Sequence, residues 1–267
     1  MATKTHKILV TGGLGYIGSH VVVELQNKGF GVVIIDDLSN SSLHVLDRIF
    51  NITKVKPLFE KIDLKDKYSV VDFFKRHVDI DGVIHFAARS LVGESVQQPD
   101  VYYRNNVVGT LNLVNEMINN DIHNLGFSST AAIFGNPITE KIAEDHPKNP
   151  INPYGQSKLM VENMLRDICA VHDINATCFR YFNAAGADPS GSIGEAHDPE
   201  THLIPNILKS TISGGSVLKV FGNDYETTDG TGARDYIHVV DLALAHIGAL
   251  NQSKLDKFEI LNIGGGK

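Results

Sequence analysis

Cysteine is almost absent from this chain of 267 residues, since only Cys169 and Cys178 occur. Two cysteines do not make a disulfide framework, which excludes the small disulfide-stapled secreted domains. Cys169 falls in a helical pattern and Cys178 in an apolar strand pattern. We therefore expect two buried thiols in a reducing compartment.

Long apolar runs are also absent. No stretch is long enough to span a bilayer, which argues against a membrane protein. The N-terminal residues lack the apolar core of a signal peptide and lead almost at once into a short strand pattern. Together with the few cysteines, this predicts a cytoplasmic location.

An excess of positive charge is missing too. Lys and Arg number 24 against 31 Asp and Glu, for a net charge of −7 and a pI of about 5.9. This balance argues against a nucleic-acid or anionic-membrane partner, so an anionic ligand requires a local pocket of amides or basic groups. The hydrophobic fraction of 42% is typical of globular proteins. With no internal repeat or linker, we expect one α/β domain or one domain with a lobe.

The first informative pattern is a strand, a glycine loop and a helix. Lys7–Thr11 is a short β-branched apolar run, and Gly12, Gly15 and Gly18 follow before an amphipathic helical pattern. In a dinucleotide-binding turn the first glycine permits the tight turn, and the second lets the backbone approach a pyrophosphate at the helix N-terminus. The third allows close packing of helix and strand. The context favours dinucleotide binding over an ordinary glycine-rich turn.

The second strand pattern supports this prediction. It ends in Asp36, about 20 residues beyond the loop, where an acidic residue binds the adenosine ribose hydroxyls. Asp36 would repel a 2′-phosphate, and Asp37-Leu38 offers no arginine to hold one. The sequence therefore predicts NAD as the cofactor, in preference to NADP.

Strand and helix patterns then alternate. Strands are expected at 56–61, 83–86, 125–128 and 176–180, and helices at 69–77, 101–120 and 153–172. This order predicts an α/β fold with a doubly wound parallel sheet whose ligands lie at the carboxyl ends of the strands. After residue 183 polar loops dominate, with a helix expected at 202–213, a strand at 218–221 and the last elements at 235–238, 240–251 and 259–263. We predict a dinucleotide-binding domain over 1–183 and a smaller substrate lobe over 184–267, interleaved with the last parts of the sheet.

The helix expected at 153–172 carries Tyr154 and Lys158 four residues apart, on one face. A phenol beside an ammonium makes a base, because the positive charge lowers the tyrosine pKa from its usual value of about 10. Taken alone, the pair is more typical of a surface tyrosine and lysine on an ordinary helix, since such pairs are common at this spacing.

The motifs together resemble the extended short-chain dehydrogenase/reductase family, and within it the UDP-galactose 4-epimerases. The matching segments include T-G-G-L-G-Y-I-G-S-H, H-F-A-A-R-S-L-V-G-E-S-V, F-S-S-T-A-A-I-F-G, P-Y-G-Q-S-K-L-M-V-E, R-Y-F-N-A-A-G-A and D-G-T-G-A-R-D-Y-I-H-V-V-D-L-A. They extend over essentially the whole chain.

The resemblance implies a Rossmann sheet that binds NAD and a smaller lobe that binds a UDP-sugar. It implies interconversion of UDP-galactose and UDP-glucose by oxidation at C4, rotation of the 4-keto intermediate and re-reduction. Tyr154 matches the base, Lys158 its partner and Thr130 the active-site hydroxyl. The positions that match NAD contacts are Gly12, Gly15, Tyr16, Ile17, Gly18, Asp36, Asp37, Asn40, Asp63, Leu64, Phe86, Ala87, Ala88, Asn105, Ser128, Tyr154, Lys158 and Phe182. The positions that match UDP-sugar contacts are Thr130, Tyr154, Asn183, Leu203, Phe221, Arg234 and Tyr236.

Three departures from the family pattern stand out. Ser90 replaces a frequent lysine near the cofactor, and His202 replaces a frequent asparagine beside the nucleotide. The chain stops at Lys267, where family members continue, so we expect a C-terminally incomplete lobe and leave the sugar range open. Family members also pair helices corresponding to 101–120 and 153–172, which implies a homodimer.

Alternative functions are weighed on particular residues. A nucleotide-sugar 4,6-dehydratase requires an acidic pair after the active-site threonine, where this chain has Ala131-Ala132. A 4-epimerase of UDP-N-acetylhexosamine or UDP-glucuronate stays open, as does an idle NAD-binding regulatory protein. His85 and His238 lack a second ligand at metal spacing, so we predict no metal site there.

Overall fold

The computed structural model describes residues 6–212, 218–220, 222–250 and 256–266. Its centre is a seven-stranded sheet in which every adjacent pair of strands is parallel. The strand order is β3 (Leu58–Lys61), β2 (Gly31–Asp36), β1 (Lys7–Thr11), β4 (Gly82–His85), β5 (Asn124–Ser128), β6 (Asn175–Tyr181) and β9 (Phe258–Ile263). The prediction of a doubly wound parallel sheet is confirmed.

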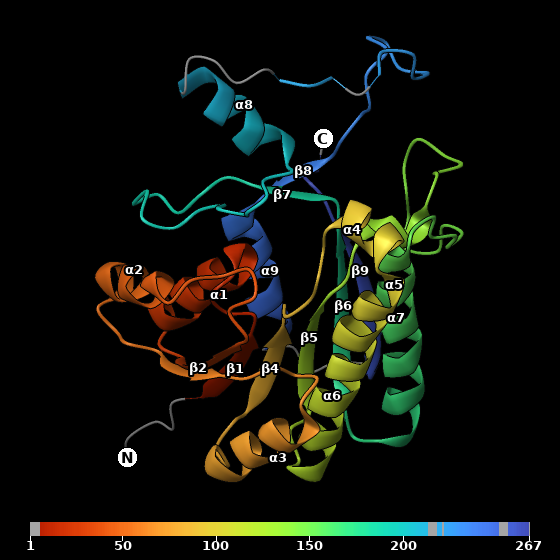
Figure 1. Cartoon of the computed structure of the whole chain (residues 1–267). Helices are drawn as coiled ribbons and strands as arrows, with labels where there is room; N and C mark the ends of the chain where they lie inside the picture. Colours follow the sequence, from red (N-terminus) through yellow and green to blue (C-terminus); the bar gives the residue numbers. More distant parts are fainter. Residues whose placement is uncertain (1–5, 213–217, 221, 251–255, 267) are drawn as a thin grey trace.

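Helices cover both faces of this sheet (Figure 1). One layer holds α1 (Tyr16–Asn27), α2 (His44–Thr53) and α9 (Val239–Leu250), and the other holds α3 (Lys67–Arg76), α6 (Gly109–Asn119) and α7 (Pro153–Val171). Successive side chains of a strand point to opposite faces. Ile8 and Val10 of β1 therefore join the core under the first layer, and Leu9 joins the core under the second.

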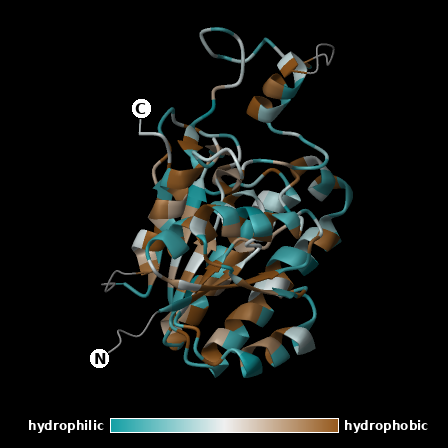
Figure 2. Ribbon diagram, turned by 90° about the vertical axis from the view of Figure 1, so that its left-hand side faces the viewer, coloured by the Kyte–Doolittle hydropathy of each residue, from teal (hydrophilic) through white to brown (hydrophobic). Residues whose placement is uncertain are grey.

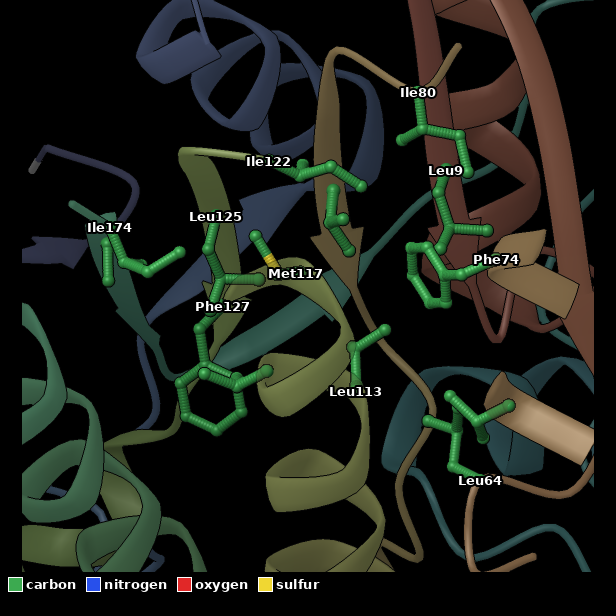
Figure 3. Packing of buried hydrophobic residues seen from close by; sticks show 14 of the residues in the cluster. Leu9, Leu64, Phe74, Ile80, Leu113, Met117, Ile122, Leu125, Phe127 and Ile174 are labelled. Atoms are coloured by element: carbon green, nitrogen blue, oxygen red, sulfur yellow. The ribbon is translucent and has the colours of Figure 1, made fainter. Parts of the chain in front are cut away.

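The second core is the larger of the two. Figure 3 shows part of it from close by. Leu125 and Phe127 of β5 lie there with Leu113 and Met117 of α6, all at most 1% exposed. Full burial of one such side chain contributes about 1.5–3 kcal/mol. This packing fixes the strand ends, and with them the loops that carry the predicted site.

Element boundaries agree with the sequence-based expectations to within a few residues, with two corrections. The helix expected over 101–120 is divided into α5 (Pro99–Tyr102), a π-helical segment over Tyr103–Val108 and α6. The strand expected at 218–221 is wrong for residues 218–220, which have no regular structure, and Phe221 lies outside the described residues. Leu218 and Val220 are exposed there. Strand formation requires a neighbouring strand, and no pairing is described for this run.

Several short elements were not anticipated. They are α2, α4 (Val92–Gln97), a 3₁₀ turn at Ala131–Phe134, and β7 (Asn183–Ala185), which pairs in parallel with β8 (Tyr236–His238). The helix α8 (Leu203–Ile212) stands apart from the sheet layers and has no buried residue (Figure 2). By contrast, α9 and β9 return to the sheet. Within the described residues, no helix has the length and apolarity needed to cross a membrane.

Candidate active site

The strand order reverses between β1 and β4, which are neighbours in the sheet although β2 and β3 lie between them in sequence. In doubly wound sheets, ligands bind at the carboxyl ends beside such a reversal. Thr11 and His85 end these two strands side by side, and the His85 Nδ1 lies 2.6 Å from the Thr11 hydroxyl. The other ring nitrogen lies 2.8 Å from the Thr110 hydroxyl. Burial lowers the His85 pKa to about 3, so the ring is a neutral structural group.

The glycine loop after β1 has the backbone that a bound pyrophosphate requires. Gly12 has φ +66°, and a Cβ there would lie 2.7 Å from the Ala87 nitrogen. A Cβ on Gly18 would lie 2.2 Å from the Gly12 oxygen, so both positions exclude a side chain. Helix α1 begins after Gly15 with no side-chain cap and no acidic residue in its first turn. Its N-terminal amides therefore remain available for an anion, which fits the diphosphate of a dinucleotide.

Asp36 lies at the end of β2, beside this loop. It is buried and accepts hydrogen bonds from the Leu14 amide (3.1 Å), the Leu38 amide (2.9 Å) and the Ser41 hydroxyl (2.7 Å). Burial raises the Asp36 pKa, and these hydrogen bonds oppose that shift. The carboxylate thus ties the glycine loop to the loop after β2, where Asp37 and the exposed Asn40 follow.

The ends of β3 and β4 supply the next predicted residues. Asp63 accepts from the Lys65 amide at 2.9 Å, and the Lys65 ammonium lies 3.3 Å from the Asn105 side-chain oxygen. Leu64 is buried and its carbonyl accepts from Asn112 at 2.8 Å. After β4, Phe86, Ala87 and Ala88 are partly buried. These positions follow the same edge of the sheet as Gly12 and Asp36.

The predicted catalytic residues lie just after the carboxyl end of β5 and in the first two turns of α7. Helix α7 begins at Pro153, and the Asn152 side chain caps it by accepting from the Gly155 amide at 2.8 Å. Tyr154 lies in its first turn, and the Thr130 hydroxyl acts to lower the pKa of its phenol. The Lys158 ammonium, one turn on, donates to the Ser128 carbonyl at 2.8 Å.

The expected electrostatics of this pair need a correction. We predicted that Lys158 lowers the Tyr154 pKa, but desolvation of the phenol raises it, and the Thr130 hydrogen bond opposes the rise only in part. Lys158 is itself buried, and burial lowers its pKa to about 7. The reason is that an ammonium enclosed by protein loses its hydration, which favours the neutral amine.

A buried ion pair behind these residues was missed. Arg180 of β6 donates from Nε (2.9 Å) and Nη2 (2.7 Å) to the two oxygens of Glu162, and Ser129 also donates to this carboxylate. Ser129 precedes Thr130, and Glu162 lies one turn after Lys158 on α7. The available signal was the i, i+4 spacing of Lys158 and Glu162, which puts both on one helix face.

Thr130 and Tyr154 are also predicted UDP-sugar positions, and the remaining positions of that set belong to other parts of the chain. Asn183 pairs with Tyr236 in the β7–β8 ladder and donates to the Asp235 carbonyl at 2.9 Å. Arg234 is exposed and donates to the neighbouring Ala233 carbonyl, and Leu203 is exposed at the start of α8. Phe221 lies outside the described residues, and Phe182 is partly buried between β6 and β7. In the part of the chain that is described, no hydrogen bond or ion pair joins these residues to Thr130, Tyr154 or Lys158.

The chain is similar to several known UDP-glucose 4-epimerases. A UDP-glucose 4-epimerase of Dictyostelium discoideum is 46% identical over 265 residues, which are 98% of this chain and 77% of the relative. A Stenotrophomonas maltophila UDP-glucose-4-epimerase, solved with NAD and formylated UDP-arabinopyranose, has a TM-score of 0.93 and 42% identity, and the match covers 98% of this chain and 79% of that one. The UDP-Glc/GlcNAc 4-epimerase of Campylobacter jejuni has a TM-score of 0.83 and 38% identity, and the match covers 98% of this chain and 79% of that one.

The family model matches nearly the same length. It is the model of the NAD dependent epimerase/dehydratase family, and it spans residues 8–264, from β1 to the glycines after β9. The reversal of strand order, the uncapped glycine loop and the Lys158–Ser128 hydrogen bond all lie within that range. This protein belongs to the NAD dependent epimerase/dehydratase family.

Proposed function

We propose that this protein is an NAD-dependent isomerase that interconverts UDP-galactose and UDP-glucose. The sugar is oxidised at C4, the 4-keto intermediate rotates, and re-reduction occurs on its other face. The observation that carries the proposal is that Lys158, one turn after Tyr154 on α7, donates to the Ser128 carbonyl at the end of β5, at the same sheet edge as the glycine loop. The names of relatives such as the Dictyostelium discoideum enzyme support the substrate pair.

The residues that hold NAD are the glycine loop and the strand ends beside it. The α1 amides after Gly15 bind the pyrophosphate, because they lack a competing cap. Asp36 accepts from the adenosine ribose, and its charge disfavours a 2′-phosphate. When bound, NAD serves as the hydride acceptor and donor at C4.

Proton transfer is the task of Tyr154 and Thr130. A sugar hydroxyl is a poor acid, so its oxidation requires a base in hydrogen-bond contact. The Thr130 hydroxyl lowers the pKa of this phenol, and in the proposed reaction it relays the proton from the C4 hydroxyl to it. Desolvation raises the Tyr154 pKa, so the phenolate requires positive charge nearby. Lys158 supplies that charge when it is protonated, and it also holds the nicotinamide ribose.

The UDP-sugar is assigned to residues 184–267 together with the end of the first domain, 1–183. Arg234 suits a diphosphate, since its planar fork of donors matches phosphate oxygens. It is exposed, and among the described residues its guanidinium donates to the adjacent Ala233 carbonyl alone. UDP-N-acetylglucosamine is the second candidate substrate, because the Campylobacter jejuni relative carries both sugars in its name.

We further propose a homodimer formed through α6 and α7, which lie side by side (Figure 1). Leu111 on α6, Met160 on α7 and the preceding Val108 are between 37% and 45% exposed. Burying such residues in a four-helix contact removes apolar surface from water. Sedimentation is expected to show a dimer at micromolar concentration, and a monomer would contradict this assignment. The buried thiols Cys169 and Cys178 support the cytoplasm as the compartment.

The test of the proposed chemistry is Tyr154→Phe, assayed with UDP-galactose for UDP-glucose formation. The ring still packs, but the proton acceptor is gone, so turnover is expected to fall by about 10²–10⁴-fold. Bound NAD, measured by its absorbance after release, is expected to stay near wild type. Tyr68→Phe, at an exposed tyrosine, is the matched control and is expected to leave turnover unchanged.

Turnover near the wild-type rate in Tyr154→Phe would disprove the assigned base. A wild-type chain that retains NAD yet converts neither UDP-galactose nor UDP-N-acetylglucosamine would support the idle regulatory alternative instead.

A further inference from the structure

The loop between β7 and α8 contains two Glu-x-His pairs, Glu195-Ala-His197 and Glu200-Thr-His202, which have no part in the proposed proton and hydride transfers. The structure brings all four side chains together, and one ligand atom from each lies within 4.8 Å of the others. The Glu195 Oε1 lies 3.1 Å from the His197 Nδ1 and 2.6 Å from the His202 Nδ1. The Glu200 Oε1 lies 3.3 Å from the same His202 nitrogen. Two imidazoles and two carboxylates therefore converge on one point.

Both carboxylates of this cluster are buried. The Glu195 side chain is 9% exposed and that of Glu200 is 4% exposed. The Glu200 Oε1 accepts from two backbone amides, but its Oε2 is buried and has no hydrogen-bond partner among the described residues. The Lys209 ammonium lies 3.9 Å from that oxygen, beyond hydrogen-bond distance. A buried carboxylate oxygen without a donor is costly, so this oxygen is a candidate ligand for a cation.

We propose that Glu195, His197, Glu200 and His202 form a binding site for one divalent transition-metal ion of the zinc class. Zinc binds imidazole nitrogen and carboxylate oxygen at about 2.0–2.2 Å, which places neighbouring donors of a tetrahedral site about 3.4 Å apart. The separations of 3.1 and 3.3 Å are close to that value, and the 2.6 Å contact opens slightly on binding. Magnesium and calcium prefer oxygen donors only, so the two imidazoles disfavour them.

The position of the cluster indicates a structural role for the ion. His202 immediately precedes α8, the helix that stands apart from the sheet. The His197 ring lies 6.3 Å from the Tyr16 ring, at the start of α1, and the Tyr16 hydroxyl donates to the Gly186 carbonyl at 2.7 Å. An ion held by both Glu-x-His pairs would fix the end of the loop and the start of α8 against the glycine-loop helix. The site is separate from Thr130, Tyr154 and Lys158, so it is testable without reference to turnover.

The experiment uses the full chain after dialysis against a chelator. Addition of CoCl₂ is expected to produce visible d–d absorption that saturates at one equivalent, and ZnCl₂ is expected to displace the Co²⁺ and abolish the absorption. Calorimetry with ZnCl₂ is expected to give one site, and MgCl₂ is expected to give no heat. Zn²⁺ is also expected to raise the melting temperature of the wild-type chain.

Two near-isosteric variants test the donors. Glu200→Gln and His202→Asn are each expected to weaken Zn²⁺ binding by at least about 10–100-fold, since loss of even a supporting partner of a metal ligand has that effect. His44→Asn, at an exposed histidine of α2, is the matched control and is expected to bind Zn²⁺ like wild type. The proposal is overturned if wild type gives no Co²⁺ absorption, or if both variants bind Zn²⁺ as tightly as wild type. In either case the cluster is a network of hydrogen-bonded His–Glu pairs only.

Discussion

Two buried glutamate sites in this molecule have opposite surroundings. Glu162, behind the catalytic residues, is 3% exposed and receives donors on both oxygens from Arg180 and Ser129. Glu200, in the loop before α8, is 4% exposed, yet one of its oxygens has no donor. Burial is thus nearly equal while donor supply differs. The difference lies in the hydrogen-bond donors around each buried carboxylate, and not in its burial. A carboxylate whose oxygens all have donors is a structural ion-pair partner, whereas an oxygen without a donor is the reason that we propose a cation at Glu200.

The largest expected loss of stability comes from removing Glu162, the carboxylate whose two oxygens both have donors. Glu162→Ala leaves the Arg180 guanidinium buried without its counter-ion, and the free energy of unfolding is expected to fall by about 3–5 kcal/mol. Urea denaturation at neutral pH measures this loss. Glu60→Ala is the surface comparison: Glu60 pairs with Arg76 where both are partly exposed, and its loss is expected to cost at most about 1 kcal/mol.

A double variant separates lost pairing from lost packing. Glu162→Leu with Arg180→Met removes both charges and keeps the volume, so it is expected to be more stable than Glu162→Ala alone. Equal losses in Glu162→Ala and Glu60→Ala would show that the Arg180 pairing contributes no more than a surface ion pair.

The sequence predicts the sheet well because the patterns that indicate its strands and turns each lie within a short stretch of residues. The apolar runs, the glycine loop and the acidic end of the second strand each lie within a few residues, and the period of the side chains decides the element. The Arg180–Glu162 pair is different, since it joins β6 to α7 across 18 residues. In the sequence, Arg180 is recognisable as the last residue of a strand pattern, and nothing in that pattern indicates its partner. Burial by other elements also reversed the expected direction of the Tyr154 pKa shift. Such effects depend on tertiary contacts, which periodicity does not report.

The second comparison is between a buried histidine, His246, and an exposed one, His172. It predicts how the free energy of unfolding changes with pH. His246 of α9 packs against Phe179, and burial lowers its pKa to about 4, while a hydrogen bond to the Leu242 carbonyl opposes the shift. The unfolded chain binds this proton near pH 6.5 and the folded chain only near pH 4, so the stability contributed is present above pH 6.5 and is lost as pH falls toward 4. The full loss is about 3 kcal/mol.

His246→Phe removes this proton-binding site and is expected to flatten the acid side of the stability profile. Urea denaturation of both chains between pH 7.5 and pH 4.5 measures the slopes. His172→Asn, at an exposed histidine, is expected to leave the slope unchanged. Parallel profiles for wild type and His246→Phe would contradict the assignment. A residual slope is expected in the variant, because burial also lowers the His85 pKa, to about 3.

The smallest expected effect concerns the hydrogen bonds of one threonine at the reversal of strand order. Thr11→Val keeps the shape of the side chain but removes the buried hydroxyl that lies 2.6 Å from the His85 Nδ1 and accepts from the Ala87 amide at 3.3 Å. The unpaired nitrogen is expected to lower the free energy of unfolding by about 1–3 kcal/mol. Thr139→Val, at an exposed threonine whose hydroxyl bonds only to a nearby carbonyl, is expected to change it by at most about 0.5 kcal/mol. If both substitutions had the same small effect, the Thr11 hydroxyl would contribute nothing to the stability of the His85 site. The contrast between fully hydrogen-bonded polar groups at the sheet and the unpartnered oxygen of Glu200 would then fail at this strand end.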